Sequence, residues 1–211
     1  MTQTETRGRP RLREDAEILD AALRAFAAVG YEAMSVRSLN GELGLSHGAI
    51  SQRFGAKEDL YYAALHHGFV GFFADIATER AGRPQDLDEF EELREAIRAF
   101  LVAASHRPEL GRLMNQEGLH ATDRLDHFVR QVFLPGAAPT LDLLARLAER
   151  GEIHPVSGRA VFFLVAHGAE APYTLTALSA AFDDIDGPLD PMAHADAVTD
   201  LIMRGLRRSP D

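Results

Sequence analysis

Residues 36–60 of this 211-residue chain read VRSLNGELGLSHGAISQRFGAKEDL, and this stretch decides the fold of the N-terminal region. Apolar residues recur at helical spacing over residues 36–43, and Ile50 and Phe54 form an i, i+4 apolar pair on a second short segment. Gly44 separates the two, because glycine adopts the left-handed conformation that ends a helix at low cost. Two short amphipathic helices around a tight turn predict a helix-turn-helix, whose second helix can enter the DNA major groove.

The second predicted helix carries a polar face that could meet DNA. Its polar side chains are those of His47, Ser51, Gln52 and Arg53. Ser46 is predicted to cap this helix and Ser35 the preceding one. Neither serine is followed three residues later by Glu or Gln, so no capping box supports these boundaries. A helical hairpin with no role in DNA binding therefore remains the alternative.

Lys57 is the only lysine among 22 lysines and arginines, and it stands where a third helix should begin. A cation at a helix N-terminus opposes the helix dipole, whereas the following Glu58 and Asp59 suit that position. A lysine in an unfavourable place suggests a specific task, such as a contact with a DNA phosphate. The alternative is a solvated surface lysine held by Glu58 or Asp59.

Residues 18–60, ILDAALRAFAAVGYEAMSVRSLNGELGLSHGAISQRFGAKEDL, closely resemble the N-terminal domain of the tetracycline-repressor (TetR) family. The matching landmarks, in order and at family spacing, are Ala21-Ala22, Phe26, Gly30-Tyr31, Ser35-Val36, Gly44, Ser46, Gly48, Phe54 and Lys57-Glu58. The resemblance implies an all-α, homodimeric, ligand-responsive transcriptional regulator. The rest of the chain matches the family only in helix count and general pattern.

The resemblance also implies roles for individual residues. Ser46, His47, Gly48 and Ala49 would start the recognition helix, Ser51, Gln52 and Arg53 would be its main contacts, and Lys57 would meet the phosphate backbone. The chain departs from the family's usual residues at Asn40, Leu43, His47, Ser51, Arg53 and Ala56. These departures put in doubt any operator inferred from better-known relatives. The predicted DNA-binding residues are Arg9, Arg11, Ser35, Arg37, Ser46, His47, Gly48, Ala49, Ser51, Gln52, Arg53 and Lys57.

The net charge of −10 is unusual for a DNA-binding protein, but it is unevenly distributed. Residues 1–60 hold 8 basic and 9 acidic side chains, whereas the remainder holds 14 basic and 23 acidic ones. DNA binding requires a local basic surface and not a basic chain. The arginine-rich residues 7–13 predict a flexible arm that could enter a minor groove. A solvated tail adding diffuse electrostatics is the alternative.

The composition excludes several classes of protein. No cysteine is present, which excludes disulfides and cysteine chemistry, and the nine histidines show no metal-binding spacing. We therefore expect no metal and no cofactor. No P-loop, nucleophile elbow or supported pair of catalytic carboxylates occurs, so the chain is not expected to be an enzyme. No apolar stretch follows a basic N-terminus, which predicts a cytoplasmic protein without a signal peptide.

Helical periodicity continues to the C-terminus and predicts an all-α chain. The predicted helices after the motif cover residues 57–78, 87–106, 108–120, 123–150, 157–182 and 192–208, with loops at 80–86 and 183–191, and a helix at 14–29 precedes it. Residues 160–182 are nearly apolar, but His167, Glu170 and Pro172 argue for a buried helix and against a membrane span. The predicted domains are a basic arm (1–13), a three-helix DNA-binding domain (14–60) and an effector-binding and dimerisation domain (61–211).

Two groups of residues are candidate sites in the second domain. The predicted ligand-binding residues are Phe100, Met114, Glu117, His120, His167, Glu170 and Tyr173. The predicted dimer interface consists of Leu175, Leu178, Phe182, Leu201, Ile202 and Leu206. A few polar groups in an apolar helical bundle are what a small-molecule pocket needs. The alternative is hydrogen-bonded core pairs that fix the register of the helices.

The sequence as a whole favours a homodimeric repressor that binds a pseudo-palindromic DNA operator and is released by a small molecule. Two alternatives stay open. One is a ligand-binding helical protein whose DNA binding has decayed, suggested by the unusual Ser51 and Ala56. The other is an α-helical enzyme that uses Glu117, His167 and Glu170.

Overall fold

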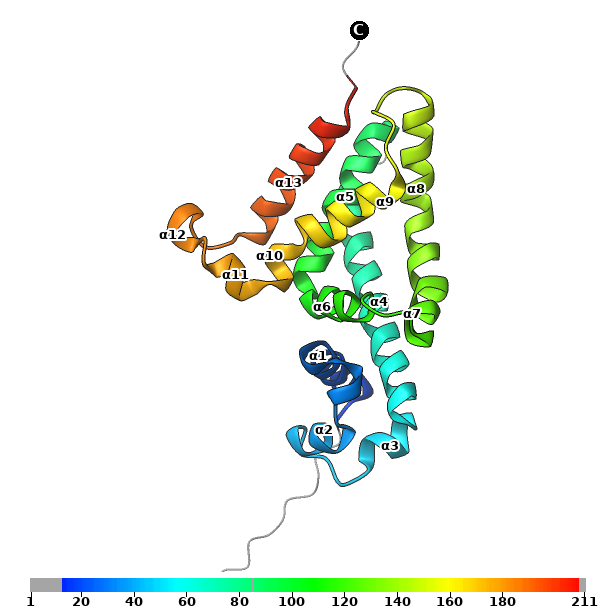
Figure 1. Ribbon diagram of the computed structural model, residues 1–211, viewed down its shortest axis with the longest axis vertical. Helices are drawn as coiled ribbons and strands as arrows, with labels where there is room; N and C mark the ends of the chain where they lie inside the picture. The colour runs from blue at the N-terminus through cyan, green and yellow to red at the C-terminus, as the bar shows by residue number, and fades with distance from the viewer. Residues whose placement is uncertain (1–12, 85, 209–211) are drawn as a thin grey trace, which may run out of the picture. The chain divides into compact units, whose positions relative to one another are not determined.

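The computed structural model describes residues 13–84 and 86–208, and the regular secondary structure of this part of the chain is helical, as predicted (Figure 1). The predicted DNA contacts Arg9 and Arg11 lie outside the described residues. The only β-type contact in the described part is an isolated bridge between Ile153 and Arg207. The helices are α1 Asp15–Ala33, α2 Val36–Glu42, α3 Ala49–Phe54, α4 Lys57–Ala81, α5 Glu89–His106, α6 Pro108–Glu117, α7 Asp123–Phe128, α8 Leu134–Glu149, α9 Gly158–Phe163, α10 Ala171–Thr174, α11 Thr176–Ala180, α12 Asp183–Asp186 and α13 Pro191–Leu206, with two π-helical segments, η1 Val129–Phe133 and η2 Leu164–Ala169.

The chain forms two compact units that divide between Gly68 and Phe69, inside α4. The predicted boundary at residues 60/61 lies earlier on the same helix. In the first unit, α1 buries one apolar face. Its buried residues are Ile18, Ala22, Leu23, Phe26 and Ala27. The rings of Tyr31 and Tyr61 pack with Phe26, with centroids 5.1 to 5.9 Å apart, so an aromatic cluster joins α1 to α4.

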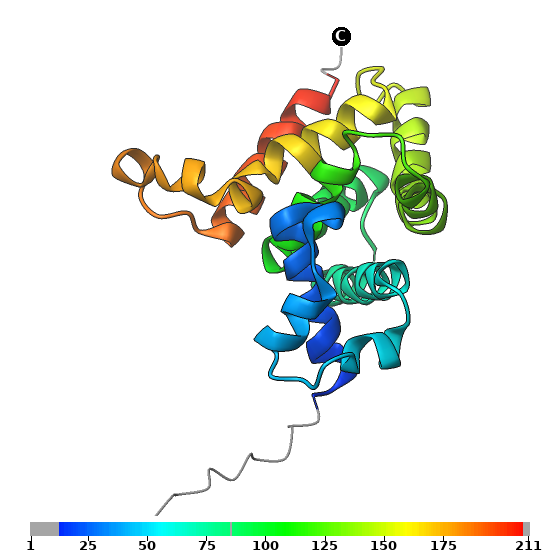
Figure 2. The same ribbon diagram turned by 60° about the horizontal axis from the view of Figure 1, so that its bottom comes forward.

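The helix-turn-helix is present in the first unit, but its turn differs from the prediction (Figure 2). Ser35 caps α2 as expected, since its hydroxyl accepts a hydrogen bond from the backbone N–H of Ser38. Ser46 does not cap α3. That helix begins three residues later, behind Gly48, whose φ of 82° is a left-handed conformation that favours glycine. Of the residues 46–49 predicted to start the recognition helix, only Ala49 lies in it, whereas Ser46, His47 and Gly48 precede it.

A buried amide from α2 replaces the missing cap. Asn40 Nδ2 donates to the carbonyl of Val36 at 3.0 Å, which fixes the amide, and its Oδ1 accepts from the backbone N–H of Ile50 at 3.2 Å. The first N–H groups of a helix lack partners within that helix. Asn40 therefore satisfies the first turn of α3 and ties the two helices of the motif together.

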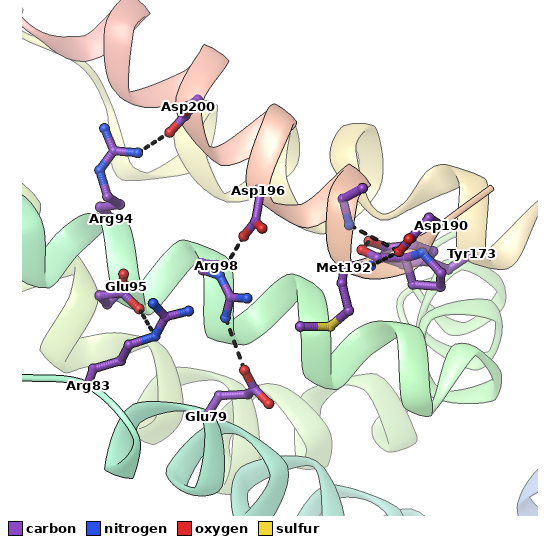
Figure 3. Close-up of polar contacts among 12 residues, drawn as sticks. Glu79, Arg83, Arg94, Glu95, Arg98, Tyr173, Asp190, Met192, Asp196 and Asp200 are labelled. Atoms are coloured by element: carbon purple, nitrogen blue, oxygen red, sulfur yellow. Dashed lines mark hydrogen bonds and ion pairs between the residues drawn. The ribbon is translucent and has the colours of Figure 1, made fainter. Parts of the chain in front are cut away.

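The second unit has an apolar core shared by α5, α8, α9, η2 and α13. Ion pairs flank this core (Figure 3). Arg98 of α5 pairs with Asp196 of α13 at 2.6 Å and with Glu79 of α4 at 3.0 Å, and Arg94 pairs with Asp200. Because Arg98 is largely buried between two carboxylates, these pairs fix α5 against its neighbours.

Two of the long predicted helices are interrupted. Residues 123–150 form α7, η1 and α8, and α7 is capped by Thr122, whose hydroxyl accepts from Leu125 N. Pro135 lacks the N–H that a continuous α-helical ladder requires, which accounts for the break beside it. Residues 157–182 are interrupted similarly and form α9, η2, α10 and α11, with the π-helical segment η2 just before Pro172 at the start of α10.

The remaining corrections are local. The predicted loop at 183–191 contains the short helix α12, and α13 begins at Pro191 behind Asp190, whose carboxylate accepts from the N–H groups of Met192 and Ala193. Pro108 lies in the first turn of α6 and Ser157 caps α9, so both helices begin where the sequence predicted. No helix in the described residues is long and apolar enough to cross a membrane.

Candidate functional sites

The second helix of the motif presents a small polar surface. Ile50 is fully buried and anchors α3, whereas Ser51 and Gln52 are exposed. Ser46 and His47 are also exposed, but they lie in the turn before the helix, and Gly48 and Ala49 are half-buried. On α2, Arg37 is exposed and Ser35 serves as the cap. The freest polar side chains of α3 are thus those of Ser51 and Gln52.

Arg53 has intramolecular partners that the sequence did not reveal. Its guanidinium donates to the carbonyl of Arg13 at 2.7 Å and pairs with the carboxylate of Asp15 at the start of α1. Arg13 in turn donates from Nε to the carbonyl of Leu43 at 3.4 Å. In this state Arg53 connects α3 to α1, and a base contact would require its pair with Asp15 to open.

The contacts of Lys57 differ from both roles considered from the sequence, which were a phosphate contact and a surface lysine held by Glu58 or Asp59. Its Nζ donates to the carbonyl of Glu32 at 3.1 Å and lies 4.7 Å from the centroid of the Tyr31 ring, so it is docked on the end of α1. The acid that supports the start of α4 is Asp59, whose Oδ2 accepts from Ala56 N at 2.9 Å. A structural role for Lys57 thus exists beside the predicted phosphate contact.

The second unit contains a cavity of about 310 Å³. Its wall is mainly aromatic, and pairs of rings from different elements meet edge-on or tilted, as Phe72 and Phe100 do at 5.4 Å. The lining phenylalanines are Phe69, Phe72, Phe73, Phe100, Phe128, Phe133 and Phe162. Both π-helical segments contribute to the wall, and π-helical turns are frequent at functional sites. Helical periodicity alone did not assign most of these rings to the site, although the closely spaced phenylalanines at 69, 72 and 73 were a visible signal.

The structure brings four of the seven predicted ligand residues to this cavity, namely Phe100, Met114, His167 and Glu170. The other three lie elsewhere. Glu117 is buried against Arg124 and Thr122, both at 3.3 Å. Tyr173 is buried and donates its hydroxyl to the carbonyl of Pro191 at 3.0 Å. His120 is exposed beyond the end of α6, so the helical spacing used to place it does not apply.

These positions correct the hypothesis of one shared pocket. Glu117 also does not join His167 and Glu170 in the cavity, so the catalytic group considered from the sequence is not assembled there. For Glu117 and Tyr173, the alternative of hydrogen-bonded core residues describes what the structure shows.

The charged and titratable groups of the cavity differ in how they are compensated. Arg80 pairs with Glu92 at 3.2 Å, and Arg107 pairs with Asp75 at 2.9 Å. His167 shares a hydrogen bond with Asn115 at 2.6 Å, and burial lowers the pKa of its imidazole. Burial raises the pKa of the Glu170 carboxyl to about 7.

Gly111 provides the space for the Glu170 carboxyl. A Cβ atom at residue 111 would overlap Glu170 Oε1 and would lie 2.9 Å from Thr174 Cγ2. Even the second of these distances is well below van der Waals contact. The carboxyl therefore rests directly against the backbone of α6, at the wall of the cavity.

The predicted interface residues divide into two groups. Leu175, Leu178, Phe182 and Leu201 are exposed, with Leu178 at 61%. Ile202 and Leu206 are only 6% and 8% exposed and belong to the core of the second unit, so they cannot form a contact surface in this conformation. Ile185, Leu189 and Met192 are further exposed apolar residues in the same part of the chain.

Comparison with known proteins agrees with this architecture. Residues 18–64 match the family model described as "Bacterial regulatory proteins, tetR family". The chain is 38% identical over 85 residues to the HTH-type transcriptional repressor AcnR of Corynebacterium glutamicum, which covers 40% of this chain and 39% of that protein. For AcnR of Corynebacterium efficiens the identity is 51%, over 40% of this chain and 39% of that protein. The chain thus matches these curated relatives over about two fifths of their length.

Solved structures extend the similarity to the second unit. The TetR family transcriptional regulator PfmR from Thermus thermophilus is 25% identical, with a TM-score of 0.62, and the match covers 94% of this chain and 100% of that one. A tetR-family regulatory protein from Rhodococcus has the same fold at 20% identity, with a TM-score of 0.64 and coverage of 94% and 100%. Residues 18–64 thus match the TetR family of bacterial regulatory proteins, and the chain as a whole is similar in fold to solved regulators of that family.

Proposed function

We propose that this protein is a homodimeric, DNA-binding transcriptional repressor whose affinity for its operator is changed by a small molecule bound in the second unit. The observation that carries the proposal is the helix-turn-helix of residues 36–54, which lies within the segment that matches the family model. The AcnR relatives, which the chain matches over this region, are repressors by name.

The geometry of α3 supports the DNA-binding part. The helix is held from behind by the buried Ile50 and by the hydrogen bond from its N–H to Asn40, and it exposes Ser51 and Gln52. A glutamine side chain can make a bidentate contact with adenine in the major groove. Basic residues of the motif, such as the exposed Arg37, supply the sequence-independent attraction to phosphates.

Exposed apolar residues between residues 175 and 201 support the dimeric part. Monomeric proteins rarely expose many large apolar side chains together, and a two-fold contact between two copies would cover them. The candidate residues are Leu175, Leu178, Phe182, Ile185, Leu189, Met192 and Leu201. A dimer that places its two recognition helices about 34–36 Å apart would read two half-sites one DNA turn apart.

The cavity and the continuity of α4 support the ligand-responsive part. The helix begins at Lys57, beside the motif, and continues to Ala81, and its second half contributes rings to the cavity. A ligand that binds more tightly to one conformation of α4 shifts the population toward that conformation. Operator affinity then changes by the difference in ligand affinity between the two conformations.

Selection of genomic fragments that bind the purified protein, followed by gel-shift titration of the selected site, tests the proposal. Gln52→Ala should weaken binding to that site by about 1–3 kcal/mol through a loss at particular base pairs. Gln131→Ala is the matched control, because Gln131 is an exposed glutamine of η1 outside the motif. Equal effects of the two substitutions, or binding without sequence preference, would contradict the proposal.

A further inference from the structure

The cavity of the second unit contains one charged group without a compensating partner. Glu170 is only 5% exposed, and burial is the only cause that shifts its pKa, without any contribution from a hydrogen bond or a neighbouring cation. In the described part of the chain, the two arginines that line the cavity are already paired with Glu92 and Asp75. Glu170 thus contributes the unbalanced charge of the wall.

Three other features describe the surroundings of this carboxyl. The backbone N–H of Glu170 bonds to the carbonyl of Val165 at 3.1 Å, which is the i→i−5 pattern of the π-helical segment η2. The carboxyl rests on Gly111, where any larger residue would displace it. The neighbouring His167 is held by Asn115. A buried carboxylate held without a partner is unfavourable, and a bound cation would offset that cost.

The rest of the cavity suits the apolar part of a ligand. Seven phenylalanines line it, and the faces of aromatic rings also attract cations. We infer that the cavity binds an organic cation, whose protonated nitrogen pairs with the Glu170 carboxylate while its apolar body lies among the phenylalanine rings. This inference rests on the proposed effector role of the second unit.

Three small molecules with different head groups provide the test. 4-Phenylbutylammonium is a cation, 4-phenylbutanol is neutral, and 4-phenylbutyrate is an anion, while all three carry a phenyl ring on a four-carbon chain, whose last carbon in the butyrate is the carboxyl carbon. Isothermal titration calorimetry on the full-length protein at pH 8 would measure each affinity. The ammonium should bind at least about tenfold more tightly than the alcohol, because a hydrogen bond between charged groups is stronger than a neutral one.

Two substitutions distinguish Glu170 from a general effect of charge. Glu170→Gln should reduce affinity for the ammonium by about tenfold or more and change affinity for the alcohol by less than about threefold. Glu117→Gln is the matched control, because Glu117 is another buried carboxylate on a neighbouring helix but lies outside the cavity. It should leave the preference for the ammonium intact.

Several results would overturn the inference. Tighter binding of the butyrate would assign the cavity to carboxylic acids, which a protonated Glu170 could hydrogen-bond. Equal affinities for the three molecules, or an unchanged preference in Glu170→Gln, would remove the role of the carboxylate. If none of the three molecules bound at millimolar concentration, the inference that the cavity binds an organic cation would also be rejected. Operator binding is measured on the same sample. If the protein binds its operator but not the ammonium, only the inference fails, and the proposed DNA-binding function stands.

Discussion

Replacing Glu170 with glutamine should change how the stability of the protein depends on pH. In the folded protein, burial raises the pKa of this carboxyl from its ordinary value of 4.5 to about 7. The folded state therefore holds the proton more tightly than the unfolded state does. Stability contributed by protonation is fully present below about pH 4.5 and is lost as the pH rises through about 7. Glutamine does not titrate, so the free energy of unfolding of the Glu170→Gln variant does not fall in this way as the pH rises.

The pKa values set the size of the effect. The difference between 4.5 and about 7 corresponds to roughly 3 kcal/mol in all, of which about 2.5 kcal/mol falls between pH 5 and pH 8. Glu170→Gln should therefore gain about 2.5 kcal/mol relative to the wild-type protein over that interval. The other titratable groups near Glu170 are His167, Tyr173 and His194, and they are common to both proteins. Their contributions cancel in the difference.

Urea unfolding followed by circular dichroism at pH 5, 6, 7 and 8 would measure the two free energies of unfolding. Protein concentration must be constant, because assembly contributes to apparent stability. Met114→Leu is the control, since Met114 lines the same cavity without titrating, and its effect should be the same at every pH. A difference between wild type and Glu170→Gln that varied by less than about 0.5 kcal/mol from pH 5 to pH 8 would refute the reasoning.

Three further substitutions address the other parts of the molecule. Leu178→Asp would place a charge in the proposed interface, where burial without a partner is costly, and light scattering should show monomers; an unperturbed dimer would reject this surface. Lys57→Ala should weaken binding to all DNA sequences alike and lower the salt slope by about one, and gel shifts at several salt concentrations that showed no change would remove its phosphate contact. Asn40→Leu leaves the Ile50 N–H without its acceptor, so unfolding free energy measured in urea should fall by about 1–3 kcal/mol; a variant as stable as wild type would show that the amide does not hold α3.

Local sequence signals located most of the helices correctly. The apolar periodicity of residues 36–54 placed the helix-turn-helix, and Ser35, Ser157 and Pro108 marked helix starts that the structure contains. Such signals succeed because caps and periodic faces depend on residues within one turn of each other. The interruptions of the helices at η1 and η2 were harder to predict from the sequence, since a proline indicates a break without indicating how the backbone accommodates it.

The sequence by itself determined the helical character of the chain, the position of the helix-turn-helix and the resemblance of this segment to the TetR family. Only the tertiary structure decided that Asn40 caps α3 and that Arg53 meets Asp15, because both partners come from distant turns of the chain. The tertiary structure also showed that Glu117 and Glu170 have different surroundings. Both are carboxylates on apolar helices, but Arg124 neutralises the first, whereas the arginines that line the cavity beside the second are paired with other carboxylates. Periodicity identifies the buried face of a helix, but the chemistry of a buried charge depends on what the opposite helix places against it.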